Sequence, residues 1–264
     1  MFHYFGYGSN INLKALRAKG VDPLSSQKGR LIGWRLRFNV QHWFKHEGGM
    51  GNIEQTNNEN DNVEGVVHKC NDESLIPLDK LEAYGIGYDR IEVAIETSNG
   101  IIKALTYVGL PAFIDNNCLP TERYKNIIIS GAEHAGLTQS YIDNIKSHPI
   151  HRMPEYPKFK VTLKDNVVYN EEELSNKTHL TALNGYVFDM RNSRPELDCL
   201  FDIFGGKDMT LFHLKRLDSS TGNETINDVI NGNIGKEGIN YINIYLHEYA
   251  KEFNCIGKFV YNQL

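Results

Sequence analysis

The sequence predicts an α+β protein with two domains. Strand-like segments dominate the first 110 residues, helical segments occupy 119–148, and a second mixture of strands and helices follows from residue 158. The stretch 153–157 between them holds two prolines, which is typical of a linker. A chain of 264 residues is long enough for two domains of ordinary size. We therefore expect one domain over residues 1–150 and a second over residues 158–264.

Composition narrows the class of protein. A hydrophobic fraction of 41%, with 14 tyrosines and 12 phenylalanines, can fill a core, so global disorder is not expected. The net charge of −5, without a Lys/Arg run, makes nucleic acid a poor candidate partner. No apolar run approaches 18 residues and no signal peptide is recognisable, so no membrane association is expected. Four widely spaced cysteines predict free thiols in the cytoplasm.

The segment His3–Asn10 is the candidate functional loop. Its aromatic start predicts a buried strand, and Gly8-Ser9-Asn10 predicts a tight turn, because glycine accepts positive φ and asparagine tolerates it. Residues 11–19 are compatible with a helix. A strand, a turn and a helix start bring successive backbone N–H groups together, which suits an anion. An ordinary strand-to-helix turn is the alternative interpretation of the same residues.

Alternation and turn patterns define the next elements. We expect a half-buried strand over 29–40, a turn or bulge over 48–53, an exposed loop over 56–62, a short strand over 63–68, and a hairpin formed by 91–96 and 101–108. His42 and His46 are four residues apart, but no third ligand has a supporting spacing. A metal site is therefore not expected.

A helix predicted over residues 74–85 carries the candidate acid–base group. Glu82 lies at the edge of its apolar face, beside Leu78 and Leu81, and Gly85 is the expected end. A carboxylate at such an edge is usually solvated, whereas a partly buried one is a candidate general base. Two further helices, over 119–136 and 137–147, complete the first domain.

The second domain has its own pattern. We expect a strand over 158–162, a helix capped by Asn170, a hairpin turning at Asn184-Gly185, a helix over 239–253 and a last strand over 256–260.

The first 150 residues resemble the γ-glutamylcyclotransferase family. The matching motifs are Tyr4-Phe5-Gly6-Tyr7-Gly8-Ser9-Asn10, Val63-Glu64-Gly65-Val66-Val67, Leu78-Asp79-Lys80-Leu81-Glu82 followed by Gly87-Tyr88, and Ala104-Leu105-Thr106-Tyr107-Val108. Ala83 departs from the pattern, because the family usually has glycine after the catalytic glutamate. The resemblance implies a small mixed β-barrel with attached helices.

The resemblance also implies an activity that needs no metal or cofactor. Members of the family cyclise a γ-glutamyl amine, amino acid or peptide to 5-oxoproline and release the amine. By resemblance, Glu82 is the catalytic acid–base residue and the Gly8-Ser9-Asn10 backbone binds the substrate, while Tyr7, Tyr88 and Tyr107 are candidate substrate-binding residues. Each of these tyrosines is equally compatible with core packing. The motifs do not name the leaving group.

Residues 158–264 resemble the cytochrome b5-like fold, in particular its membrane-associated progesterone receptor branch. The matching segments are Leu183–Asp189, Phe204–Thr210 and the helix leading to Ile256-Gly257. The His-Pro-Gly-Gly haem motif is absent, and Phe201 stands where that branch places a ligating tyrosine. His213 is more typical of a packed or surface histidine than of a ligand. We therefore expect a haem-free domain, and binding of a protein partner is a candidate function for it.

Two alternatives to the enzyme remain open. The cyclotransferase and b5-like folds can serve as a non-enzymatic interaction or small-ligand-binding protein, since fold does not guarantee activity. The main function can also lie in the second domain as a haem or hydrophobic-ligand carrier, which the missing iron ligands disfavour. Glu82 together with an intact Gly8-Ser9-Asn10 loop favours the enzyme.

Overall fold

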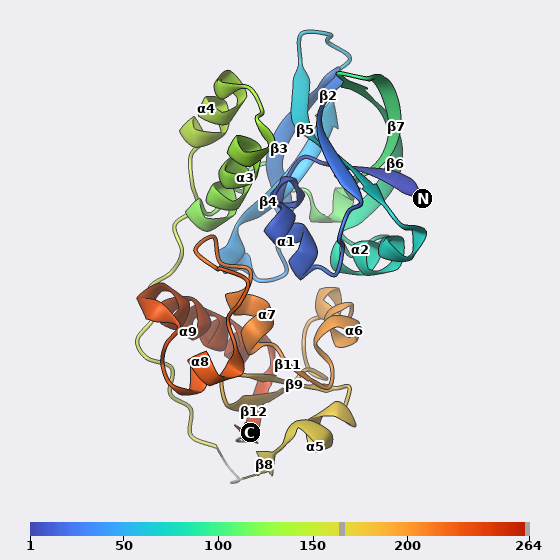
Figure 1. Cartoon of the computed structure of the whole chain (residues 1–264). Helices are drawn as coiled ribbons and strands as arrows, with labels where there is room; N and C mark the ends of the chain where they lie inside the picture. Colours follow the sequence, from blue (N-terminus) through green and yellow to red (C-terminus); the bar gives the residue numbers. More distant parts are fainter. Residues whose placement is uncertain (164–166, 262–264) are drawn as a thin grey trace. The chain divides into compact units, whose positions relative to one another are not determined.

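The computed structural model describes residues 1–163 and 167–261, and the chain divides into two compact units (Figure 1). Unit 1 is Met1–Met153 and unit 2 is Pro154–Leu264. The two-domain α+β architecture inferred from the sequence is therefore present. Among the described helices, none is long and apolar enough to cross a lipid bilayer.

A closed five-stranded barrel forms the centre of unit 1. Its strand order is β1-β5-β2-β6-β7, and the barrel is mixed because β1 runs parallel to β7 and antiparallel to β5. The strands are β1 (Phe2–Gly6), β2 (Ser25–Ile32), β5 (Asn62–Cys70), β6 (Tyr88–Thr97) and β7 (Gly100–Gly109). The expected hairpin of β6 and β7 is present, with its turn between Thr97 and Gly100.

A two-stranded ribbon and four α-helices surround the barrel. The ribbon pairs β3 (Trp34–Gln41) with β4 (Gly49–Gln55), and the helices are α1 (Leu13–Ala18), α2 (Leu75–Leu81), α3 (Glu122–Ala135) and α4 (Gln139–Ser147). Figure 1 shows α3 and α4 side by side along the barrel. Thr121 and Thr138 cap α3 and α4 by accepting hydrogen bonds from backbone N–H groups in the first turn.

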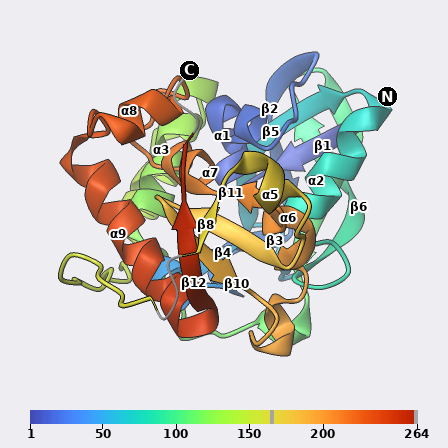
Figure 2. The same ribbon diagram turned by 90° about the horizontal axis from the view of Figure 1, so that it is seen from below.

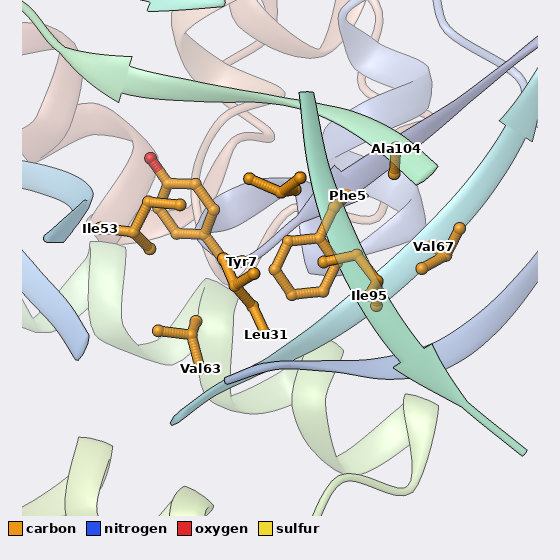
Figure 3. Close-up of a cluster of buried hydrophobic side chains, with 9 residues drawn as sticks. Phe5, Tyr7, Leu31, Ile53, Val63, Val67, Ile95 and Ala104 are labelled. Carbon is orange, nitrogen blue, oxygen red and sulfur yellow. The ribbon is translucent and has the colours of Figure 1, made fainter. Parts of the chain in front are cut away.

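Successive side chains along β1 and the residue after it point to opposite sides and join two separate hydrophobic cores. Phe5 and Tyr7 point into the barrel, where they pack against a cluster of aliphatic side chains (Figure 3). Tyr4 points the other way and packs with Leu16 of α1 and Leu78 of α2. One short strand therefore links the barrel interior to the two helices that flank the loop after it.

One expectation for this region was wrong and another was met in part. Residues 29–40 form two strands, because Gly33 adopts φ +79° and separates β2 from β3. Of residues 48–53, expected to form a turn or bulge, all but Gly48 belong to strand β4, and the β3–β4 register shifts opposite Gly51. The glycines of β4 have close neighbours. A Cβ on Gly49 would collide with the Phe38 carbonyl, and one on Gly51 would lie 3.0 Å from the Tyr124 hydroxyl.

The helix expected over 74–85 is shorter than the sequence pattern suggested. α2 ends at Leu81, and the left-handed residue that follows is Ala83, with φ +48°, two positions before the expected Gly85. A left-handed conformation costs an L-residue roughly 1–2 kcal/mol, a cost that glycine does not carry. A glycine at position 83 would adopt this conformation without that cost.

A five-stranded sheet organises unit 2. Its order is β11-β9-β10-β12-β8, with strands β8 (Val168–Tyr169), β9 (Leu180–Leu183), β10 (Tyr186–Asp189), β11 (Lys207–Asp208) and β12 (Asn254–Phe259). The helices are α5 (Glu171–Ser175), α6 (Leu200–Phe204), α7 (Thr210–Leu214), α8 (Ile226–Ile230) and α9 (Gly235–Glu252). Figure 2 shows α9 running beside β12.

Unit 2 confirms most of the local expectations. Asn170 caps α5 in a capping box with Glu173, and Asn184-Gly185 turns the β9–β10 hairpin with both residues at positive φ. The strand expected over 158–162 was wrong, because no strand forms there. Instead, the Phe159 N–H donates to the Asn243 side chain of α9 at 2.7 Å, which ties this segment to the helix.

Candidate functional site

The residues predicted for the site line one pocket at the end of the barrel. Its lining is Tyr4, Tyr7, Gly8, Ser9, Asn10, Gly51, Glu82, Tyr88, Tyr107 and Tyr124. This set contains all seven predicted site residues, and the cavity volume is about 30 Å³. That is about the volume of one small polar group, so a larger ligand enters only if it extends outward through the mouth or displaces side chains.

A buried histidine is hydrogen-bonded to the loop after β1. Gly8 precedes a 3₁₀ turn, Ser9–Ile11, and the His68 Nε2–H donates to the Asn10 carbonyl at 2.9 Å. The other ring nitrogen of His68 lies 2.8 Å from the Ser26 hydroxyl. Burial lowers the pKa of His68 to about 4, so the ring is neutral at pH 7 and can hold this pair of hydrogen bonds.

Glu82 meets this loop at the end of α2. Its Oε1 accepts a hydrogen bond from the Asn10 side-chain Nδ2 at 3.0 Å and pairs with the Lys19 Nζ at 2.7 Å. The side chains of Lys19 and Glu82 are 16% and 14% exposed, so the ion pair is largely shielded from water. Asn10 and Glu82 are 72 positions apart in the chain. The barrel therefore brings together the two motifs that the sequence singled out.

Three tyrosine hydroxyls in the pocket have fixed partners. Tyr7 donates to the Tyr107 carbonyl at 2.6 Å, Tyr88 donates to the Gly51 carbonyl at 2.8 Å, and Tyr107 donates to Asp79 at 2.5 Å. Burial raises the pKa of all three. They are neutral hydrogen-bond donors near pH 7 and do not act as bases.

Tyr124 of α3 closes the remaining side. Its hydroxyl accepts a hydrogen bond from the Gly51 N–H at 3.0 Å and also bonds to Ser9. A Cβ on Gly8 would lie 2.9 Å from the same hydroxyl oxygen. Glycine at positions 8 and 51 therefore makes room for this tyrosine.

Sequence reasoning missed four residues of the site. Tyr4 belongs to the recognised motif but was assigned only to the strand, and Gly51 was assigned to a turn or bulge. Tyr124 carried no signal beyond its place near a helix start. Lys19 looked like one more solvent-facing cation at the end of a short helix, and nothing local indicates its partner 63 positions later.

The two histidines weighed as metal ligands lie elsewhere. The His42 ring accepts a hydrogen bond from the Phe44 N–H at 3.1 Å, and the His46 Nε2 lies 3.7 Å from Glu47. Within residues 1–163 and 167–261, no group of three or more His, Cys, Asp or Glu side chains is placed to hold a metal ion.

A closed mixed barrel with a Gly-Ser-Asn loop facing a shielded carboxylate defines a cyclotransferase-type domain, and comparison with known proteins agrees. The AIG2-like family matches residues 62–145. The chain is 31% identical over 150 residues to the gamma-glutamylcyclotransferase of Bos taurus and 31% identical over 153 residues to that of Homo sapiens. Each alignment covers 55% of this chain and 78% of the relative.

A solved structure is also similar to this chain. One described as gamma-glutamyl cyclotransferase superposes with a TM-score of 0.51 at 29% identity, covering 61% of this chain and 93% of that one. The chain belongs to the gamma-glutamylcyclotransferase family through unit 1.

Proposed function

We propose that unit 1 cyclises a γ-glutamyl compound to 5-oxoproline and releases the amine, with Glu82 as the acid–base residue. The observation that carries this proposal is the shielded Glu82 carboxylate hydrogen-bonded to Asn10 of the Gly8-Ser9-Asn10 loop. The family relationship supports the same reaction class.

The reaction is an intramolecular acyl transfer. The substrate α-ammonium gives a proton to Glu82, and the nitrogen lone pair then attacks the γ-carbonyl carbon. The new C–N bond pushes the carbonyl electron pair onto oxygen. When this intermediate collapses, the bond to the leaving nitrogen breaks. Of the three ammonium hydrogens, one remains on the lactam nitrogen and two end on the released amine, transferred through Glu82.

The pocket has two tasks besides proton transfer. It must hold the folded conformer, because a correctly oriented intramolecular attack lowers the barrier by several kcal/mol. It must also stabilise the developing oxyanion or the substrate α-carboxylate, for which the backbone N–H groups of the Gly8-Ser9-Asn10 loop are the candidate donors. The Tyr7, Tyr88 and Tyr107 side chains shape the wall.

The test is release of 5-oxoproline from a panel of γ-glutamyl dipeptides, γ-glutamylamines and glutathione. Glu82→Gln keeps the shape of the side chain and removes the base, so turnover should fall about 10²–10⁴-fold. Glu92→Gln is the matched control, because Glu92 is exposed on β6, far from the pocket lining, and pairs with Lys103 at 2.8 Å. Equal turnover by Glu82→Gln on an active substrate would remove Glu82 from the mechanism. No turnover of any member by the wild type would favour a binding module.

For unit 2 we propose a haem-free scaffold with a cytochrome b5-like fold. Phe201 has no donor atom for iron, and the buried His213 ring stacks on Tyr245 with its Nε2 2.8 Å from the Tyr249 hydroxyl. A histidine engaged in this way packs a core. A Soret band after haem reconstitution of the purified protein would contradict this proposal.

A further inference from the structure

Lys19 places an ammonium group directly on the candidate acid–base residue. Its Nζ lies 2.7 Å from the Glu82 Oε1, the same oxygen that accepts a hydrogen bond from the Asn10 Nδ2 at 3.0 Å. The side chains of Lys19 and Glu82 are 16% and 14% exposed, so water and salt screen this ion pair much less than one at the surface. A cation in this position acts on the ionisation of the carboxyl group.

Buried neighbours on both sides fix the position of Lys19, which is the C-terminal cap of α1. Leu16 before it and Val21 after it are both buried, and both belong to the cluster that contains Leu78 of α2. Glu82 follows Leu78 by four residues, which is about one helical turn. The packing of α1 and α2 in one cluster therefore brings the ammonium to the carboxylate as a regular part of the fold.

The other titratable side chains around Glu82 are neutral or paired. Burial raises the pKa of the pocket tyrosines, and the Glu82 charge adds to this effect, for Tyr4, Tyr7, Tyr88, Tyr107 and Tyr124. Asp79 is charged but pairs with Arg90. Burial lowers the pKa of His68 to about 4, so this ring is neutral at pH 7. Lys19 thus brings a positive charge to a carboxylate whose tyrosine neighbours bring none.

Burial and the ammonium act on Glu82 in opposite directions. Removal from water raises the pKa of a carboxyl group, whereas a positive charge within about 4–6 Å lowers it by about 1–3 pH units. The proposed cyclisation needs ionised Glu82 at its start, because Glu82 takes a proton from the substrate ammonium. The protonated carboxyl must then give up its proton to the leaving nitrogen, a step that a neighbouring cation favours.

We propose that Lys19 is a positioning residue whose ammonium keeps Glu82 ionised and held against Asn10 of the Gly8-Ser9-Asn10 loop. This inference rests on the proposed cyclisation and adds to it a residue that acts through Glu82. A lysine that served only to tie α1 to α2 would contribute to stability without changing how Glu82 titrates. The two roles therefore differ in a measurable quantity.

The test follows the ionisation of Glu82 without any substrate. Glutamate side-chain carboxyl groups are labelled with ¹³C, and the resonance that is absent from Glu82→Gln is assigned to Glu82. Its chemical shift is then followed against pH in the wild type, Lys19→Met, Lys19→Arg and Arg17→Gln. Lys19→Met keeps an apolar side chain in place of the lysine stem and removes the charge. Arg17→Gln is the matched control, because it removes a charge from the same helix whose partner, Asp22, is exposed.

The pKa of Glu82 should rise by about 1–3 pH units in Lys19→Met, because burial then acts without the opposing charge. Lys19→Arg, which keeps a cation, and Arg17→Gln should titrate like the wild type. If Lys19→Met does not fold, Lys19→Gln carries the same test, since it also lacks the charge. An unchanged pKa in the folded variant, or an equal rise in Lys19→Arg and Lys19→Met, overturns the proposal.

The release of 5-oxoproline separates this proposal from the reaction. In an active enzyme, the acid limb of kcat/KM should move to higher pH in Lys19→Met by the same amount, because that limb reports the pKa of the essential base in the free enzyme. A raised Glu82 pKa in Lys19→Met, without turnover of any member of the substrate panel by the wild type, keeps the role of Lys19 at Glu82 and rejects the cyclotransferase activity. Turnover by the wild type with an unchanged Glu82 pKa in Lys19→Met keeps the activity and rejects the role of Lys19.

Discussion

The two units use the same residue types in opposite ways. In unit 1, five tyrosines from different elements line a cavity beside one carboxylate, Glu82. In unit 2, Tyr241, Tyr245 and Tyr249 recur every four residues along α9. Their rings pack edge to face, and Tyr245 also stacks on the His213 ring. Side chains that share one helix face pack into a core, whereas side chains that converge from separate strands and helices leave room between their polar ends.

The largest expected effect breaks the ring cluster of unit 2. Tyr245 is 1% exposed and its ring centroid lies 3.7 Å from that of His213. Tyr245→Ala should lower the free energy of unfolding by about 3–5 kcal/mol, because it removes a buried ring and leaves a cavity. Tyr245→Phe keeps the ring and should cost about 1 kcal/mol. Chemical denaturation followed by circular dichroism measures both, and equal losses would show that the hydroxyl, not the ring, matters.

The second prediction concerns pH and the histidine beneath the loop of unit 1. An unfolded histidine takes up a proton near pH 6.5, whereas the folded His68 does so near pH 4. Its stabilising contribution is therefore complete above pH 6.5 and is lost as the pH falls towards 4. The loss should reach about 3 kcal/mol. Denaturation at a series of pH values checks this slope, and His68→Gln should flatten it. A slope that persists in His68→Gln would assign the effect to other groups.

The third prediction concerns the space that the glycines leave for Tyr124. Gly51→Ala would place a Cβ 3.0 Å from the Tyr124 hydroxyl and should cost about 1–3 kcal/mol through overpacking. Gly87→Ala is the control, because its Cβ would lie 3.4 Å from the Trp43 ring and 3.8 Å from the Ala83 Cβ, which are ordinary contacts. Thermal unfolding of both variants gives the comparison, and similar shifts would contradict the proposed crowding.

The smallest expected effect concerns Ala83, which follows Glu82 at the end of α2. Ala83→Gly relieves the strain of φ +48°, an effect partly offset by the greater freedom of glycine in the unfolded chain. We expect a net stabilisation of up to about 1 kcal/mol, measured by chemical denaturation. A clear destabilisation would mean that the Ala83 methyl group, which is buried, packs better than its backbone conformation suggests.

Turns and helix caps that depend on neighbouring residues could be predicted from the sequence. The β9–β10 turn at Asn184-Gly185 and the cap at Asn170 depend on residues next to each other in the chain, and both were predicted correctly. The strand over Gly49–Gln55 was not predicted, because its glycines are set by Phe38 on the partner strand and by Tyr124, 73 positions after Gly51.

The candidate site could be anticipated where a motif marks it and not where only the fold does. The family motifs singled out the Gly8-Ser9-Asn10 loop and Glu82, which line one pocket in the structure. Lys19 was missed because its partner, Glu82, comes close only when α1 and α2 pack against β1. A short stretch of sequence carries no information about that packing.

Barrel closure has a consequence for how the pocket forms during folding. The hydrogen bond from the Tyr7 hydroxyl to the Tyr107 carbonyl spans 100 positions of the chain. Close by, β1 pairs with β7, with Tyr4 opposite Leu105. Pairings between distant parts of a chain form slowly, because a long loop must close before any contact repays its entropy. The pocket therefore cannot assemble during synthesis until β7 has emerged, and recovery of the proposed 5-oxoproline release during refolding would time the joining of β1 to β7.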